Sequence, residues 1–307
     1  MSFIEEIKNE ARKEIKTVVL PETTDIRVLE AANTILKEGF AKIVLLGEES
    51  IILNKAKENG LNLSLAKIIN PAQSEKYDEY VNAFYELRKE KGMEYETACE
   101  LMKDPVYFGM MMVKQGDCDG LVSGAIHSTK DTLKPALQIL KTAPDTKLVS
   151  AFFLMVVPNC EYGENGTFVF SDCGLNPNPN AEELSEIAIS SAKSFEQLTK
   201  KKANVAMLSF STHGSAESES TKKVIQATNL VKEKAPNILV DGELQLDAAI
   251  IPEVAKSKAP KSNVAGHANT LIFPNLDAGN IGYKLTRAFS KSGKLWSTMP
   301  RNSKTSK

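Results

Sequence analysis

Short apolar runs alternate with amphipathic helical patterns through the first 70 residues of this 307-residue chain. The runs predict strands at 17–20, 41–46 and 67–69, and the patterns between them predict helices at 25–38 and 48–59. Gly39 and Gly60 directly follow the two helices, as glycines do at helix C-termini. Strand and helix in this order, with short connections, indicate a parallel sheet covered by helices.

The same alternation returns after a composition change near Lys147. We therefore predict an α/β protein of two three-layer αβα domains with mostly parallel sheets, facing one cleft between the domains. The first domain is expected to span 1–147, with 290–307 as a remnant tail, and the second 148–289. Asp241-Gly242 predicts a turn after a strand, and Pro252 predicts a break in the following helix.

Composition excludes several classes of function. The net charge of −1 gives no electrostatic case for nucleic acid, and no apolar run is long enough to span a bilayer. The first residues carry charges of both signs and no apolar signal core, so a cytoplasmic location is expected. The four cysteines form no C-x-x-C pair and are expected to be buried free thiols, and no metal site is predicted.

The segment from Gly120 to Lys141 has the strongest functional pattern. An apolar strand end and a small-residue turn lead to Ser128, a helix N-cap candidate, and to a helix with apolar residues at regular spacing. Free backbone N–H groups and the positive end of a helix dipole bind anions, which favours a phosphate site. An ordinary capped strand-to-helix junction explains the pattern equally well. His127 has the best functional case of the three histidines.

Familiar nucleotide and hydrolase motifs are absent from the sequence. It contains no G-x-G-x-x-G after a strand, no G-x-x-x-x-G-K-[ST] and no G-x-S-x-G. Nicotinamide binding, P-loop chemistry and α/β-hydrolase chemistry therefore have no support.

Seven blocks of the sequence resemble the phosphate acetyl/butyryltransferase family, in the family's order and at its spacing. They are KTVVLPETTDIRVLEAA, YVNAFYELRKEKGM, DGLVSGAIHSTKDTLKPALQILKTAP, LNPNPNAEELSEIAISSAKSF, VAMLSFSTHGSA, LVDGELQLDAAIIPEVAKSKAP and ANTLIFPNLDAGNIGYKL. The resemblance implies reversible acetyl transfer between acetyl phosphate and coenzyme A, which is a substrate, with no cofactor. It also implies a homodimer. A butyryl-preferring sister enzyme and a non-catalytic paralogue that binds coenzyme A or acyl phosphate remain alternatives.

The resemblance also assigns substrate-binding residues. Arg88, read by itself, lies in a basic cluster typical of a solvated helix end, but it matches a family arginine that holds substrate. Lys134 stands where the family usually has arginine, and a lysine lacks the planar fork that binds phosphate in a bidentate manner, so weaker substrate binding is expected. The full set of substrate-binding residues implied is Arg88, Ser128, Thr129, Lys134, Asn280 and Lys284.

The resemblance ends near the C-terminus, where 292–307 read SGKLWSTMPRNSKTSK. The family continues instead into a segment resembling G-P-x-x-Q-G-x-x-K-P-V-N-D-L-S-R-G, which carries a catalytic serine and arginine, with an aspartate beyond, so no catalytic residue is assigned here. One choice of codons for 292–307, read one nucleotide later, encodes Q-A-N-Y-G-P-Q-C-Q-G-I-A-K-P-V. We therefore expect a frameshift between about Lys284 and Lys291, and low activity of the chain as written.

Overall fold

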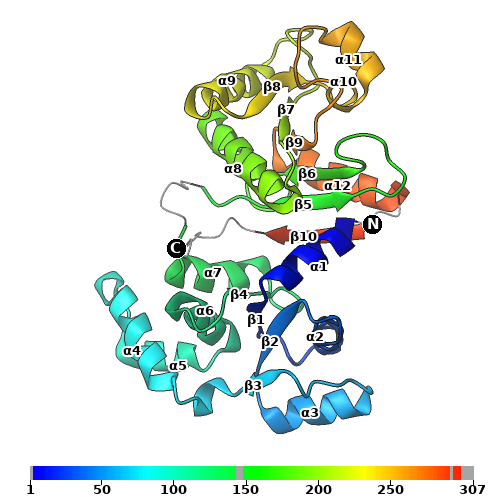
Figure 1. The fold of residues 1–307 in the computed structure, drawn as a ribbon. Coiled ribbons are helices and arrows are strands. Elements are labelled where there is room, and N and C mark those ends of the chain that lie inside the picture. The colour runs from blue at the N-terminus through cyan, green and yellow to red at the C-terminus, as the bar shows by residue number, and fades with distance from the viewer. Residues whose placement is uncertain (1–2, 143–147, 291–292, 299–307) are drawn as a thin grey trace. The chain divides into compact units, whose positions relative to one another are not determined.

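The computed structural model describes residues 3–142, 148–290 and 293–298, and the chain divides into two compact units, Met1–Lys141 and Thr142–Lys307 (Figure 1). The division lies a few residues before the expected boundary at Lys147. Each unit contains a sheet with helices packed on it, and parallel strand pairs predominate. The predicted α/β class with mostly parallel sheets is confirmed.

The first unit follows the alternation read from the sequence. Its elements are α1 (Phe3–Lys13), β1 (Lys16–Leu20), α2 (Ile26–Glu38), β2 (Ala41–Leu46), α3 (Glu49–Glu58), β3 (Lys67–Ile69), η1 (Pro71–Gln73), α4 (Tyr77–Arg88), η2 (Lys89–Lys91), α5 (Tyr95–Met102), α6 (Pro105–Gln115), β4 (Gly120–Leu121) and α7 (Thr129–Ile139). All strands of this sheet are parallel, in the order β3-β2-β1-β4.

Alternate residues of the central strands pack against opposite helical layers, because successive side chains of a strand point to opposite faces. Leu20 of β1 and Leu45 of β2 join one buried cluster with residues of α2 and α3. On the other face, a Cβ placed on Gly109 of α6 would lie 2.5 Å from Leu121 Cδ1 and 3.1 Å from Val19 Cγ1. Glycine therefore lets α6 approach the sheet closely, and this unit has the three predicted layers.

The second unit contains a larger mixed sheet. Its elements are β5 (Phe152–Val156), β6 (Thr167–Ser171), α8 (Ala181–Thr199), β7 (Asn204–Leu208), α9 (Glu219–Lys234), β8 (Leu239–Leu244), α10 (Leu246–Ile250), α11 (Pro252–Lys258), β9 (Thr270–Ile272), α12 (Leu276–Ser290) and β10 (Gly293–Thr298). The strand order is β10-β5-β6-β9-β7-β8. The pairs among β6, β9, β7 and β8 are parallel, whereas β5 pairs antiparallel with both β6 and β10.

Two helical layers also cover this second sheet. Phe168 and Phe170 of β6 pack in one buried cluster with Ala249 of α10, Ala255 of α11 and Tyr283 of α12. Helix α8 contacts β6, β7 and β9, and α9 contacts β7 and β8. By the alternation of side chains along a strand, α8 and α9 cover the face opposite to α10–α12.

Two local expectations need correction. Asp241-Gly242 is not a turn, since β8 continues through both residues. A Cβ on Gly242 would lie 2.6 Å from Met207 Cβ, so the glycine serves a close approach of β8 to β7. In the expected remnant tail, Gly293–Thr298 forms β10 and pairs with β5 of the second unit. The remaining tail residues, 291–292 and 299–307, lie outside the described residues. Pro252 does separate α10 from α11, as predicted.

Candidate functional site

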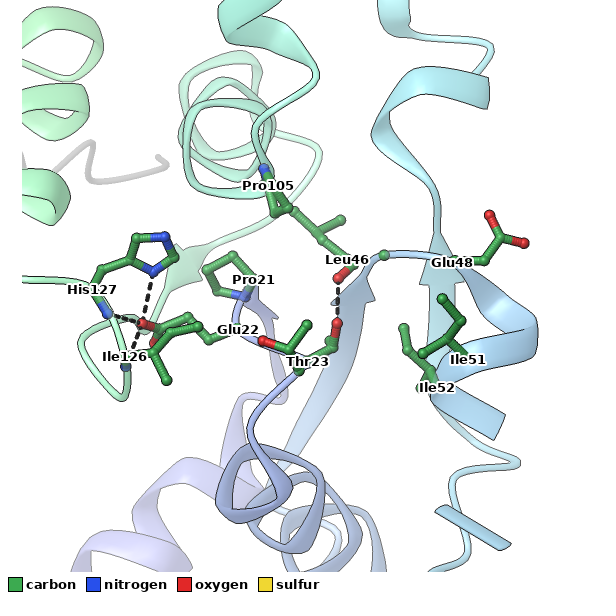
Figure 2. A pocket seen from close by; sticks show the side chains of 12 residues that line it. Pro21, Glu22, Thr23, Leu46, Glu48, Ile51, Ile52, Pro105, Ile126 and His127 are labelled. Carbon is green, nitrogen blue, oxygen red and sulfur yellow. Dashed lines mark hydrogen bonds and ion pairs between the residues drawn. The ribbon is translucent and has the colours of Figure 1, made fainter. Parts of the chain in front are cut away.

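The carboxyl ends of β1, β2 and β4 meet at one edge of the first sheet, where loops at 21–25, 47–48 and 122–128 follow them. From β1 the chain passes through α2 to β2 on one side, while β4 lies on the other side of β1. A change of direction of this kind is where open α/β sheets bind ligands. A hollow of about 180 Å³ opens here, lined by both apolar and polar residues (Figure 2).

The loop after β4 is held by the carboxylate of Glu22, which follows β1. The backbone N–H groups of Gly124 and Ala125 donate to Glu22 Oε2 at 2.7 and 2.8 Å. Those of Ile126 and His127 donate to Oε1 at 2.9 and 2.8 Å (Figure 2). Four amides that the phosphate hypothesis took to be free for a ligand are therefore already occupied by an internal anion.

The charge of Glu22 is fixed by these bonds. Its side chain is 2% exposed, and burial by itself raises the pKa of a carboxyl group. The hydrogen bonds from the backbone of His127, Ala125 and Ile126, and from the His127 side chain, outweigh burial and lower the pKa of Glu22 to about 2. Glu22 is consequently ionised at neutral pH and can only accept hydrogen bonds.

This sets the tautomer of His127. Its Nδ1 lies 2.8 Å from Glu22 Oε1, and because the carboxylate can only accept, Nδ1 must carry the hydrogen. Figure 2 shows the ring with Nδ1 directed at Glu22 and Nε2 on the opposite edge. The side chain of His127 is 28% exposed.

Ser128 and Thr129 lie at the start of α7. Ser128 is the predicted N-cap: its Oγ accepts from the backbone N–H of Asp131 at 3.2 Å and donates to Asp131 Oδ2 at 2.6 Å. The hydrogen bond from the Ser128 side chain is the main cause that lowers the pKa of Asp131. Thr129 and Lys134 are exposed, and within the described residues the Lys134 side chain makes no hydrogen bond or ion pair.

Arg88 is the last residue of α4 and is half-buried rather than solvated. Its Nε is buried and has no hydrogen-bond partner among the described residues. The pKa of the Tyr107 hydroxyl on α6 is raised, mainly by burial, and the charge of the nearby Arg88 guanidinium partly opposes this increase. Tyr107 Oη in turn donates to Gln138 Oε1 of α7 at 2.9 Å, so Arg88 and α7 share one neighbourhood.

Two more polar atoms of this unit are buried with no hydrogen-bond partner among the described residues, and neither belongs to the substrate-binding set read from the sequence. They are Ser123 Oγ, just after β4, and Thr132 Oγ1, in the first turn of α7. Buried polar atoms in proteins are almost always paired, so unpaired ones at a sheet edge that suits ligands indicate a place for a polar ligand. Only a three-dimensional structure reveals them, because both residue types are common in turns and helix starts.

Asn280 and Lys284 belong to α12 of the second unit. Asn280 Nδ2 donates to the carbonyl of Cys173 at 3.4 Å, and Lys284 Nζ lies 5.9 Å from the centre of the Tyr283 ring. The predicted cleft that would bring these two residues to the residues of the first unit stays a prediction.

The cysteines are only partly as expected. Cys118 and Cys173 are buried, whereas Cys99 and Cys160 are half-buried, and none of the four forms a disulfide. Cys160 lies in the surface loop between β5 and β6, which explains its exposure. In the part of the chain that the structure describes, no group of three or more His, Cys, Asp or Glu side chains could hold a metal ion. No helix among the same residues is long and apolar enough to cross a membrane.

Comparisons with known proteins agree with this fold. A model of the phosphate acetyl/butaryl transferase family matches residues 2–295. The phosphate acetyltransferase of Acetivibrio thermocellus is 61% identical over 292 residues, which is 95% of this chain and 87% of that protein. The phosphate acetyltransferase of Clostridium acetobutylicum is 50% identical over 292 residues, or 95% of this chain and 88% of that protein.

Solved structures give the same result. A phosphotransacetylase from Streptococcus pyogenes has a TM-score of 0.90 at 39% identity, covering 98% of this chain and 91% of that one. The fold and the matches together define an acyltransferase. The chain belongs to the phosphate acetyl/butaryl transferase family, which confirms the resemblance read from the sequence. The expected frameshift rests on a segment that is partly outside the described residues, and it stays a prediction.

Proposed function

We propose that this chain catalyses the reversible transfer of an acetyl group between acetyl phosphate and coenzyme A, at the low rate expected from the sequence. Membership of the family and 61% identity to a phosphate acetyltransferase over 95% of the chain support this reaction. Both substrates carry phosphate, and the first unit offers cations and unpaired donors for it. The reaction needs no further cofactor, because the thiol of coenzyme A attacks the acyl carbonyl directly.

The observation that carries the proposal is the unpartnered Nε of Arg88. A buried donor without an acceptor is costly, and a phosphate oxygen of the substrate would satisfy it. The planar guanidinium can bind two phosphate oxygens with parallel hydrogen bonds, a geometry that also fixes the orientation of the acyl group. Arg88 is therefore proposed to hold the phosphate of acetyl phosphate.

The start of α7 supplies the remaining contacts to phosphate. Ser128, Thr129 and Lys134 are exposed there and can reach a ligand from the solvent side, while Ser123 and Thr132 offer unpaired hydroxyls from within. Lys134 contributes a compact charge rather than a bidentate fork. In the second unit, Asn280 and Lys284 of α12 are proposed to contact coenzyme A.

A homodimer in the cytoplasm remains part of the proposal. Helix α12 presents three large apolar side chains one turn apart, Ile281, Leu285 and Phe289, which are 58%, 49% and 83% exposed. Exposed apolar side chains in such a row are typical of protein–protein contact surfaces. Measuring the mass of the protein in solution by light scattering tests the dimer, and a monomer at micromolar concentration contradicts it.

The reaction is tested by incubating the purified chain with acetyl phosphate and coenzyme A and following the thioester. The expected result is acetyl-CoA formation that requires both substrates and reverses when phosphate is added to acetyl-CoA. Butyryl phosphate in a parallel assay measures the acyl preference. Calorimetry with coenzyme A runs alongside: binding without turnover favours a non-catalytic binding protein, and absence of both contradicts the proposal.

A further inference from the structure

His127 makes two hydrogen bonds to the same oxygen, one from its backbone and one from its ring. The backbone N–H and Nδ1 of His127 both lie 2.8 Å from Glu22 Oε1. Glu22 itself cannot rotate without losing the hydrogen bonds from the amides of Gly124, Ala125 and Ile126. The ring is therefore positioned before any ligand binds, which is the condition for an effective acid or base.

The free edge of the ring is accessible. Nε2 lies opposite the atom that faces Glu22 (Figure 2), and the side chain is 28% exposed while Glu22 is only 2% exposed. His127 lines the hollow at the sheet edge together with Ile126 and Pro105, which are apolar. Its ring therefore has a charged partner on one side and accessible, mostly apolar surroundings on the other.

His127 also lies next to the residues proposed to bind phosphate. His127 immediately precedes Ser128, the N-cap of α7, and its charge contributes to lowering the pKa of Asp131, after the larger effect of the Ser128 hydrogen bonds. The charged groups that face it are thus Glu22 from the loop after β1 and Asp131 from α7.

The proposed reaction requires a proton at the phosphate. When the thiolate of coenzyme A attacks acetyl phosphate, a bond forms between sulfur and the acyl carbon, and the bond from that carbon to the phosphate oxygen breaks. Without a proton, phosphate would leave as a trianion, which is a strong base and a poor leaving group. In the reverse direction, hydrogen phosphate attacks acetyl-CoA and must lose this proton.

We propose that His127 is the general acid and base that transfers a proton to and from phosphate, and that Glu22 is the residue that positions His127. Nε2 donates a proton to the departing oxygen, so that hydrogen phosphate is released, and it removes that proton in the reverse reaction. Sulfur loses one proton and phosphate gains one, so the reaction is balanced. The inference rests on the proposed function, and it adds a residue outside the substrate-binding set assigned above.

The test compares His127→Asn with the unaltered chain. An asparagine amide can still donate to Glu22 in place of Nδ1 but has nothing at Nε2. We expect kcat with acetyl phosphate to fall about 10²- to 10⁴-fold, with KM for coenzyme A changed less than about twofold. The methyl ester of acetyl phosphate releases methyl phosphate dianion, which needs no proton, so with this donor the loss should shrink to less than about threefold.

The matched control is His213→Asn, since His213 also pairs with a carboxylate, Asp241, at 3.2 Å but lies in the second unit. It should leave both rates unchanged. An equal loss with both donors in His127→Asn indicates a structural role and overturns the inference, as does no loss at all.

A second measurement does not depend on turnover. The chain has three histidines, so the ring nitrogens of a ¹⁵N-histidine sample can be assigned by single substitutions and followed while inorganic phosphate is added. Phosphate should shift the Nε2 signal of His127 and not those of His213 or His267. If phosphate binds but the His127 signal does not shift, the inference alone is overturned. If the unaltered chain shows no phosphate binding and no turnover, the proposed function is overturned.

Discussion

Glu22 and His127 are 105 residues apart in the sequence, yet one oxygen of the first accepts both the backbone and the ring hydrogen bond of the second. The pair joins the loop after β1 to the loop after β4 at the edge of the sheet where the predicted phosphate residues begin. Stability and chemistry at this edge therefore depend on a single buried carboxylate.

Acid should destabilise the protein through Glu22. Its folded-state pKa of about 2 is below the ordinary value of 4.5, so ionised Glu22 contributes stability above pH 4.5. That contribution is lost as pH falls from 4.5 through 2, and it amounts to on the order of 3 kcal/mol. Urea unfolding at a series of pH values measures it.

Glu22→Gln should remove most of the change in the free energy of unfolding between pH 4.5 and 2. It should also lower stability at pH 7, because an amide cannot accept four backbone hydrogen bonds and brings donors of its own. Glu58→Gln, at the exposed end of α3, serves as the control and should keep the full curve. A curve for Glu22→Gln that matches the unaltered protein would disprove the role of this carboxylate.

Gly109→Ala should overpack the contact between α6 and the sheet. The new Cβ would lie 2.5 Å from Leu121 Cδ1 and 3.1 Å from Val19 Cγ1, which predicts a loss of about 1–3 kcal/mol in the free energy of unfolding. Combining it with Leu121→Val, which removes the nearest atom, should cost less than the sum of the two single changes. Strict additivity would show that the crowding is relieved in some other way.

Arg88→Lys should weaken acetyl phosphate binding, because the ammonium cannot make two parallel hydrogen bonds. We expect KM for acetyl phosphate to rise about 10- to 100-fold. Stability should not fall, since the Nε that is removed has no partner within the described residues. Lys89→Met is the neighbouring control: this lysine is exposed and pairs with Glu86, and its loss should leave KM unchanged. An unchanged KM in Arg88→Lys would remove Arg88 from the site.

Lys134→Arg should strengthen the binding of acetyl phosphate. The exposed lysine lacks an internal partner in the described part of the chain, so a guanidinium there is free to bind phosphate with its fork. KM for acetyl phosphate should fall about 3- to 10-fold. Lys130→Arg, which places the same change on the exposed first turn of α7, should have no effect. If Lys134→Arg leaves KM unaltered, position 134 does not contact the phosphate.

The elements could be predicted because their signals are local. Strand β2 begins and ends at the predicted residues, Ala41 and Leu46, and Ser128 caps α7 through a hydrogen bond that spans only three residues. The predicted turn at Asp241-Gly242 was wrong, because this pair of residues suits both a turn and a close approach between strands. The sequence alone does not distinguish these two uses of glycine.

The site was less predictable because it depends on distant partners. The pattern from Gly120 onward correctly indicated a loop before a capped helix, but the amides of that loop are not free, because Glu22, more than 100 residues earlier, accepts their hydrogen bonds. Whether the polar atoms of Arg88, Ser123 and Thr132 are buried without a hydrogen-bond partner among the described residues depends on how several helices pack. A sequence pattern shows which donors exist, whereas the three-dimensional arrangement determines which remain unpaired.

The loop from 124 to 127 is anchored by its backbone, and this has a consequence for how it can vary. Glu22 recognises four N–H groups, so it places no demand on the side chains of Ala125 and Ile126. Proline is excluded at all four positions, and Gly124, with a φ of +119°, needs glycine. Residues 125 and 126 are therefore open to substitution, and a library at these two positions could alter the rim of the hollow without disturbing its anchor.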